Sequence, residues 1–312
     1  MNPRDSRRLA SIIGLAVGDA VGTTVEFLPA GSFAPHTDMV GGGPFELPVG
    51  AWTDDTSMAL CLCESLVECG GFDATDQMRR YVRWWREGYW SSTGSCFDIG
   101  ITTRQALMRF EGTGEPWSGS DDPKSAGNGS VMRLAPVVAY FADDAVAAVQ
   151  HARESSRTTH GARECVDGCE VLARLLLAGY IGGDVTAPLM PGASWSAALR
   201  AVAAMDGAVE ATPARPPSGY VVDTLACARW AVARAASFRE AVLLAANLGG
   251  DADTIAAVTG QIAGAQWGFE GIPSEWVERL ARGDEVMALA ERVVGGERGG
   301  RAAAGVWGGL GR

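Results

Sequence analysis

Carboxylate and hydroxyl side chains gather in two short segments that lie roughly 200 residues apart in the chain. The first reads Thr-Asp-Asp-Thr over residues 53–56, and the second reads Asp-Ala-Asp-Thr over residues 251–254. Mg²⁺ and Mn²⁺ prefer oxygen ligands, and carboxylates crowded into one pocket repel one another strongly without a cation. We therefore expect the two segments to meet around two divalent cations.

A simpler explanation covers part of this pattern, because each segment stands at the predicted start of a helix. Asp and Thr are common N-cap residues, since their oxygens accept the free N–H groups of the first helical turn. The helix dipole also favours negative charge at that end. Capping would explain one acidic residue in each segment and would leave the second without a role.

A glycine-rich loop reads Gly-Asn-Gly-Ser over residues 127–130 and leads into a helix expected to begin near Val131. Its glycines would let backbone N–H groups approach a pyrophosphate at a helix N-terminus. A short loop of this kind is weak evidence on its own. Arg133 would add either positive charge or a structural ion pair.

The elements that must position these residues are helices almost throughout. Apolar residues recur with helical spacing in most of the chain, and alternation typical of strands is nearly absent. The sequence predicts an all-α fold of irregular topology in one domain over residues 1–294, with a disordered tail over residues 295–312. The clearest predicted helices span residues 57–69, 74–86, 99–110, 145–154, 162–178, 222–235, 239–248 and 255–267.

The N-terminal segment resembles a signal peptide, because three arginines precede an apolar run that Asp19 interrupts. The spacing of Leu9, Ile12, Ile13 and Ala16 also fits one face of a helix. We expect a packed first helix in a cytoplasmic protein, and no stretch as long as the roughly 20 apolar residues that span a bilayer.

The composition of the chain excludes some classes of binding partner. The formal net charge is -11, so the average surface repels nucleic-acid backbones and anionic lipid headgroups, and neither partner is expected. The seven cysteines show no zinc-binding spacing, and most are expected to be buried free thiols. A monomer is expected.

Three motifs in order resemble the ADP-ribosylglycohydrolase family, which includes the dinitrogenase reductase-activating glycohydrolases. They are the segments over residues 53–56, 127–133 and 249–254. The segment over residues 14–20, Glu26 and the segment over residues 98–103 are similar to family positions too. The resemblance covers roughly residues 9 to 270.

This resemblance implies an all-α fold with a binuclear Mg²⁺ or Mn²⁺ centre. It implies a ligand set of Thr53, Asp54, Asp55, Asp251, Asp253 and Thr254. Glu26 matches a family Glu that orients or deprotonates the attacking water, and Asp98 matches an Asp that faces the scissile ribose. The diphosphate and distal ribose would contact Gly127, Asn128, Gly129 and Ser130. His160 lies at a position near the family's cleft, and a structural histidine would look the same.

The implied activity is hydrolysis of the bond between ADP-ribose and an acceptor on a protein or small molecule, with ADP-ribosyl-arginine favoured. Serine, a nucleic-acid base and an O-acyl group remain open as acceptors. The main alternative is a non-catalytic ADP-ribose-binding protein, and a metal-dependent phosphoesterase would usually add histidine ligands to a chain that has three histidines. Tyr140, Phe141 and Trp117 are candidates for stacking on adenine by proximity alone.

Overall fold

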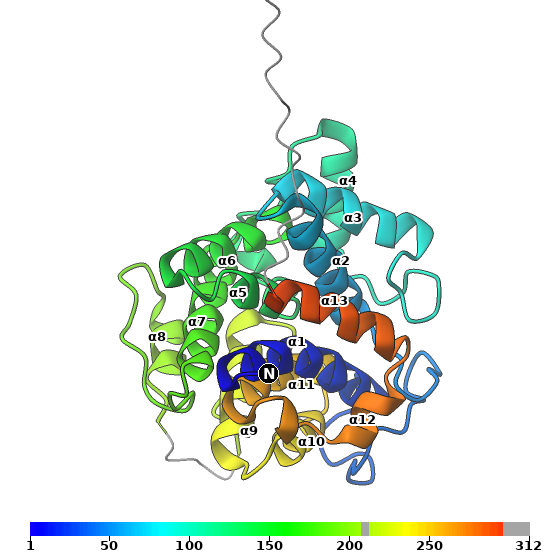
Figure 1. Ribbon diagram of the computed structural model, residues 1–312, viewed down its shortest axis with the longest axis vertical. Helices are drawn as coiled ribbons and strands as arrows, with labels where there is room; N and C mark the ends of the chain where they lie inside the picture. Colours follow the sequence, from blue (N-terminus) through cyan, green and yellow to red (C-terminus); the bar gives the residue numbers. More distant parts are fainter. Residues whose placement is uncertain (207–211, 296–312) are drawn as a thin grey trace, which may run out of the picture.

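The computed structural model describes residues 1–206 and 212–295, and these ranges contain thirteen α-helices, three short 3₁₀ helices and no strand (Figure 1). This confirms the predicted all-α class. The α-helices are α1 (Pro3–Gly22), α2 (Asp54–Cys69), α3 (Ala74–Glu87), α4 (Ile101–Thr113), α5 (Ala135–Tyr140), α6 (Ala145–Thr159), α7 (Arg163–Tyr180), α8 (Ala197–Ala203), α9 (Val221–Arg234), α10 (Phe238–Ala246), α11 (Ala252–Trp267), α12 (Ser274–Arg279) and α13 (Gly283–Gly295). The 3₁₀ helices are η1 (Thr23–Val25), η2 (Pro123–Ser125) and η3 (Phe269–Gly271).

Most of the longer helices begin and end on residues suited to that place. At α1 the Asn2 side chain accepts a hydrogen bond from the Asp5 backbone N–H, and Pro3 occupies the first turn. The N-cap side chains of α3, α6, α8 and α10 accept similar bonds. Helices α2, α3 and α4 each end on a glycine in the left-handed conformation.

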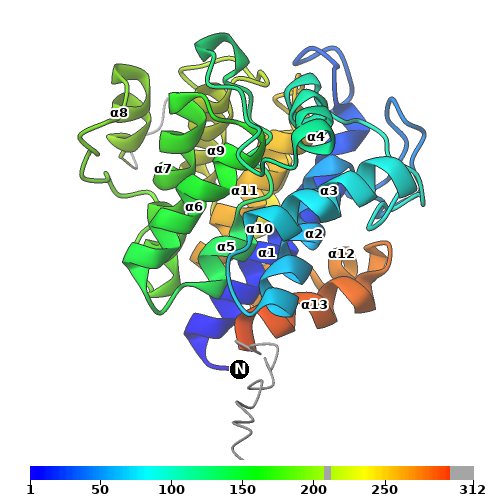
Figure 2. The ribbon, with the colours of Figure 1, turned by 90° about the horizontal axis from the view of Figure 1, so that it is seen from above.

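Helix α1 runs through the middle of the molecule and packs directly on α11 (Figures 1 and 2). Three glycines of α1, spaced four residues apart, face the backbone of α11. A Cβ atom at Gly14, Gly18 or Gly22 would lie 2.3, 2.1 or 2.4 Å from a carbonyl oxygen of α11. The two backbones are therefore in contact, and the last turn of α1 lies beside the first turn of α11.

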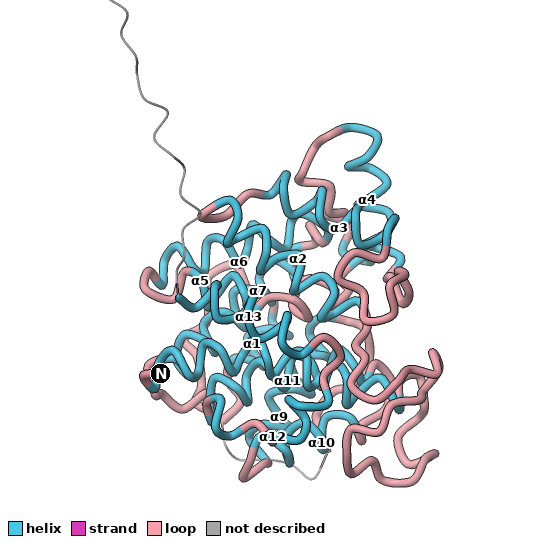
Figure 3. The backbone as a smooth tube through the Cα atoms, turned by 45° about the vertical axis from the view of Figure 1, so that its right-hand side comes forward, coloured by secondary structure: helices cyan, strands magenta, loops and turns pink. Residues whose placement is uncertain are grey.

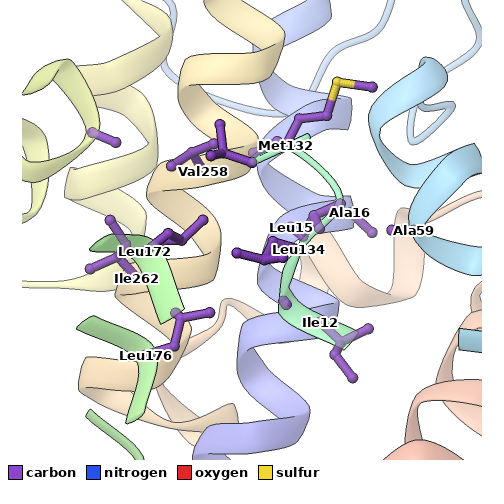
Figure 4. Packing of buried hydrophobic residues seen from close by; sticks show 14 of the residues in the cluster. Ile12, Leu15, Ala16, Ala59, Met132, Leu134, Leu172, Leu176, Val258 and Ile262 are labelled. Carbon is purple, nitrogen blue, oxygen red and sulfur yellow. The ribbon is translucent and has the colours of Figure 1, made fainter. Parts of the chain in front are cut away.

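The remaining helices complete a core around this pair. In Figure 4, Ile12 and Leu15 of α1 lie among Leu172 of α7, Val258 of α11 and Ala59 of α2. All five side chains are at most 2 % exposed. Helix α13 packs against α1, α2 and α5, so the C-terminal helix covers the N-terminal one.

The segment Pro3–Val25 is long and apolar enough to cross a membrane by length and composition, contrary to the expectation that no stretch would be. In the structure 94 % of its most apolar window is buried inside the protein. The expectation of a packed first helix is therefore confirmed, and close backbone packing on α11 explains why the segment is so apolar.

The eight predicted helices all form, with ends that differ by a few residues. The helix expected to begin near Val131 is α5, which begins later, at Ala135, because residues 129–133 form a turn. The structure adds α8, α12 and α13, which were not predicted. Two of these have six or seven residues, which is too short for a clear period. Helix α13 was readable from Val286, Leu289, Ala290 and Val293, which follow helical spacing and are buried. The predicted tail beyond Gly295 lies outside the described residues.

Candidate active site

The two acidic segments come together at the N-termini of α2 and α11. The Thr53 hydroxyl lies 3.3 Å from an oxygen of Asp253, and the Thr254 hydroxyl lies 3.4 Å from an oxygen of Asp55. The N-cap residues of these helices are Thr53 and Asp251, and neither side chain accepts a capping hydrogen bond from its own helix. Capping therefore does not explain the acidic residues, and the fold brings both segments to one place.

A carboxylate from α1 caps α2 instead. Asp19 is fully buried and accepts hydrogen bonds from the backbone N–H groups of Thr53 and Thr56, at 3.0 Å each. The hydroxyls of both threonines donate to the same carboxylate, at 2.9 and 2.6 Å. Burial raises the pKa of Asp19, and these four hydrogen bonds oppose that shift. Asp19 thus fixes the start of α2 and the direction of the Thr53 side chain.

The segment after η1 pairs with the segment that precedes α11. The Phe27 N–H donates to the Gly250 carbonyl at 2.7 Å, and the Gly250 N–H donates to the Leu28 carbonyl at 2.8 Å. Gly249 has a φ of 66°, and a Cβ atom there would lie 2.2 Å from the Leu28 carbonyl oxygen. This pairing requires glycine, and it places Glu26 beside the second acidic segment.

The carboxylates form two overlapping groups. Oxygens of Glu26, Asp251 and Asp253 lie within 4.8 Å of one another, and so do oxygens of Asp54, Asp98 and Asp253. Asp98 stands in the loop before α4, whose N-cap is Gly100, so it does not cap that helix. Its φ of 56° is unusual for a residue with a side chain and is typical of functional sites.

Burial and mutual repulsion make these carboxylates hard to ionise in the absence of a cation. Burial and the charges of Asp98 and Asp251 raise the pKa of Glu26 to about 9. Burial and the charges of Asp19 and Asp251 raise the pKa of Asp98 to about 7. The pKa values of Asp54, Asp55 and Asp253 are raised well above the usual range for the same two reasons.

Several oxygens in the cluster have no hydrogen-bond partner among the described residues. They are Oε2 of Glu26, Oδ1 of Asp55 and Oδ1 of Asp253, and all three are buried. A buried oxygen without a partner costs free energy, since it has lost its contacts with water. Unpaired anionic oxygens that face one another are suited to divalent cations.

The acidic cluster closes one end of a cavity of about 290 Å³. The acidic end is lined by Glu26, Asp54, Asp98, Asp251, Asp253 and Thr254, and the remaining wall by Phe27, Gly100, Ile101, Thr102, Thr103, Gly127, Asn128, Gly129, Met132, His160 and Gly219. Among the residues that line it there is no lysine or arginine. Thr53 and Asp55 stand behind the acidic end. Ser130 is buried and does not line the cavity, unlike the three residues before it.

The glycine-rich loop is held on both sides. The backbone N–H of Asn128 donates to the Gly219 carbonyl at 3.0 Å, and the Asn128 side chain donates to Thr224 and Asp251. Arg133 is fully buried and donates to the Gly129 carbonyl at 2.9 Å. Its hydrogen bond and its burial show that Arg133 supports the loop from behind.

His160 packs beneath this loop and lines the cavity. A Cβ atom on Gly129 would lie 2.6 Å from Cε1 of His160, so the loop and the ring are in contact. Nδ1 of His160 pairs with the Thr159 hydroxyl at 2.8 Å. Burial and the charge of Arg133 lower the pKa of His160 to about 3, so the ring is neutral at physiological pH.

The three aromatic residues considered for adenine stacking do not line the cavity. Tyr140 and Phe141 pack on each other, with ring centroids 4.9 Å apart, and Trp117 stacks on Phe72. Sequence reasoning also missed the role of Asp19. A single charged residue in the apolar second half of α1 was the signal that could have found it.

Long loops gather on one side of the molecule, seen as pink tubes at the right of Figure 3. The loop segments of the chain include Glu26, the residues just before Thr53, and Asp98.

The ADP-ribosylglycohydrolase family model matches residues 1–303. The chain belongs to this family. It is similar to the ADP-ribosylarginine hydrolase Tri1 of Pseudomonas putida (strain GB-1), with 44 % identity over 92 % of this chain and 77 % of the relative.

Two further comparisons agree. The ADP-ribosyl-dinitrogen reductase glycohydrolase of Rhodospirillum rubrum is 33 % identical over 88 % of this chain and 90 % of the relative. A solved structure described as an ADP-ribosylglycohydrolase-related protein complex superposes with a TM-score of 0.84 and 46 % identity, over 95 % of this chain and all of that one. This ADP-ribosylglycohydrolase is therefore an enzyme that hydrolyses ADP-ribosyl glycosidic bonds, as the resemblance implied.

Proposed function

We propose that this ADP-ribosylglycohydrolase removes ADP-ribose from arginine side chains and uses two divalent cations to do so. The observation that carries the proposal is the buried carboxylate cluster at the N-termini of α2 and α11, with its unpaired oxygens. The arginine assignment is supported by the relative with 44 % identity, whose name is ADP-ribosylarginine hydrolase. The acidic end of the cavity also suits a leaving group as basic as guanidine.

The side chains present fit Mg²⁺ or Mn²⁺. The ligands would be Thr53, Asp54, Asp55, Asp251, Asp253 and Thr254, all of which offer oxygen. Bound cations would neutralise the carboxylates, orient ribose hydroxyls and act as Lewis acids beside the anomeric carbon. The hydroxyl proton of Thr53 is directed at Asp19, which leaves the lone pairs of its oxygen free to bind a cation.

The chain's own groups supply the remaining chemistry. Glu26 accepts a proton from the water that attacks the anomeric carbon. The bond from that carbon to the nitrogen of the guanidinium breaks with its electron pair on nitrogen, so the arginine leaves as a neutral guanidine and then takes up the proton released from water. Asp98 faces the departing guanidino group across the cavity. The backbone N–H groups of Gly127 and Asn128 already donate to the carbonyls of Ser125 and Gly219, which leaves the N–H of Gly129 in this loop to bind the diphosphate.

We also propose that the enzyme works in the cytoplasm as a monomer. The seven cysteines are free thiols, and five of them are buried. Free thiols are typical of a reducing compartment, which supports the cytoplasm.

The test is a comparison of ADP-ribose release from ADP-ribosylarginine, ADP-ribosylserine and an O-acyl-ADP-ribose, each with Mg²⁺, with Mn²⁺ and with EDTA. We expect release from the arginine compound to be fastest and to stop in EDTA. Faster release from either other compound would show that the acceptor is wrong. Full activity in EDTA, after dialysis against the chelator, would show that the cation assignment is wrong.

A further inference from the structure

Apolar side chains are exposed at the mouth of the cavity. Phe27 and Ile101 both line the cavity, and they are 61 % and 68 % exposed. Leu28, the next residue after Phe27, is 41 % exposed, and Met108 of α4 is 57 % exposed. Single exposed apolar residues are common on proteins, but a group of them beside a binding site indicates an interaction surface. We call these four residues the apolar rim.

The exposed position of Phe27 is built into the fold. Its φ of 64° is rare for a residue with a side chain, and its backbone N–H is held by Gly250. The ring lies 6.4 Å from that of Phe45, which in turn lies 5.2 Å from that of Phe97. Strain of this kind persists only where the surrounding contacts enforce it. The Phe27 part of the rim is therefore held in place by its backbone hydrogen bond and by the half-buried rings of Phe45 and Phe97.

The rim extends away from the cavity along α4. Ile101 and Met108 are seven residues apart in one helix, so they share a face and are separated by about 10 Å along the axis. The first turn of α4 lines the same cavity as the first turn of α11, and Figure 1 shows that α4 lies at the periphery of the molecule. A compound that ends at its guanidino group inside the cavity does not extend to Met108. A polypeptide attached to that group does.

We propose that the apolar rim binds the polypeptide around an ADP-ribosylated arginine and favours apolar residues next to that arginine. The occupant follows from continuity: two rim residues line the cavity, so the chain that carries the inserted side chain must lie on the rim. The acidic residues of the site lie inside the cavity, and the exposed Arg104 is the charged residue that lies between Ile101 and Met108 on the same face of α4. This inference rests on the proposed function.

The experiment uses the full chain and three substrates. They are free ADP-ribosylarginine and two peptides of equal length, each carrying one ADP-ribosylated arginine flanked by leucines or by serines. The variants are Met108→Asn, Met108→Leu and the matched control Met190→Asn. Met190 is 82 % exposed and lies in the loop between α7 and α8, away from the cavity lining. Melting temperatures establish that each variant is folded.

We expect the unmodified enzyme to have a higher kcat/KM on the leucine peptide than on the serine peptide. Met108→Asn lowers kcat/KM on the leucine peptide about fivefold through KM, which is the size expected for losing one partly buried apolar contact. It leaves free ADP-ribosylarginine within about twofold. Met108→Leu keeps the preference, and Met190→Asn changes none of the three rates.

Two results would overturn the docking proposal while the proposed function stands. One is equal loss on the peptides and on free ADP-ribosylarginine in Met108→Asn. The other is an unmodified enzyme that does not distinguish the leucine peptide from the serine peptide. Hydrolysis of none of the three substrates by the unmodified enzyme would overturn the proposed function, and the docking proposal with it.

Discussion

Neighbouring carboxylates in this site differ in how completely their oxygens are paired. Asp19 accepts four hydrogen bonds from two threonines, so its charge is already compensated by donors of the chain. Asp55 and Asp253 each keep a buried oxygen without a partner among the described residues. We infer that Asp19 positions the site, whereas the other two are available to a cation.

Glu26→Gln tests the proposed proton acceptor. The amide preserves the shape of the side chain and cannot take a proton from water, so we expect turnover to fall by about 10² to 10⁴. Binding of ADP-ribose and of metal should be retained, and calorimetric titration beside a rate assay measures both. Unchanged turnover would assign the base elsewhere, with Asp98 the first alternative.

Asp19→Asn tests the positioning role. The amide offers one oxygen acceptor where the carboxylate offers two, so some of the donors from Thr53 and Thr56 lose their partner in a fully buried place. We expect a loss of about 2 to 4 kcal/mol in unfolding free energy, measured by urea denaturation. Metal affinity should fall too, because Thr53 is no longer oriented. Normal stability with normal metal binding would contradict this role.

At the scale of elements, the glycine-rich loop and the helix ends are shaped by close contacts. Gly129 lies so near the His160 ring that a single methyl group does not fit. We expect Gly129→Ala to displace either the loop or the ring and to weaken ADP-ribose binding at least tenfold, measured by calorimetry. The control is Gly112→Ala in α4, where nothing lies within 4 Å of the added Cβ.

The control should raise stability by up to about 1 kcal/mol, since alanine is the better helix former. It should leave ADP-ribose binding unchanged. Equal binding by both variants and the unmodified protein would show that the loop tolerates a side chain, and would remove it from the proposed diphosphate site.

Sequence reasoning predicted the helices with clear apolar spacing and the residues of the acidic cluster. It did not predict contacts between helices that are far apart in the sequence. The contact of Gly18 with Ala256 depends on two helices that meet across the chain, and no local pattern shows the partner. In the sequence Asp19 is recognisable only as the residue that interrupts an apolar run, because its donors Thr53 and Thr56 lie at the start of another helix. The candidates for adenine stacking were chosen by proximity in sequence, which does not establish proximity in space, and none of them lines the cavity.

At the scale of the whole molecule, folding forces buried carboxylates together, so we expect metal binding to contribute to global stability. Mg²⁺ should raise the melting temperature of the unmodified protein relative to EDTA, because a ligand that binds only the folded state stabilises it. Asp253→Ala should largely lose this rise. In EDTA the variant should melt at the same temperature or higher, because one member of a repelling cluster is gone.

The control for this experiment is Asp144→Ala. Asp144 caps α6 by accepting hydrogen bonds from the N–H groups of Val146 and Ala147. Its loss should cost about 0.5 to 2 kcal/mol in both buffers and leave the Mg²⁺ effect intact. If Asp253→Ala behaves like Asp144→Ala, then Asp253 is a structural residue and the proposed cation site is wrong.

The packing of α1 on α11 also sets an order of events during synthesis of the chain. Helix α1 leaves the ribosome first, and its partner follows more than two hundred residues later. At typical translation rates of about 5 to 20 residues per second, roughly ten to fifty seconds pass between the synthesis of α1 and that of α11, which covers it. Over that interval the nascent protein presents an apolar segment that resembles a membrane anchor, and it holds only half of the acidic cluster. The enzyme can gain activity only after α11 has been synthesised.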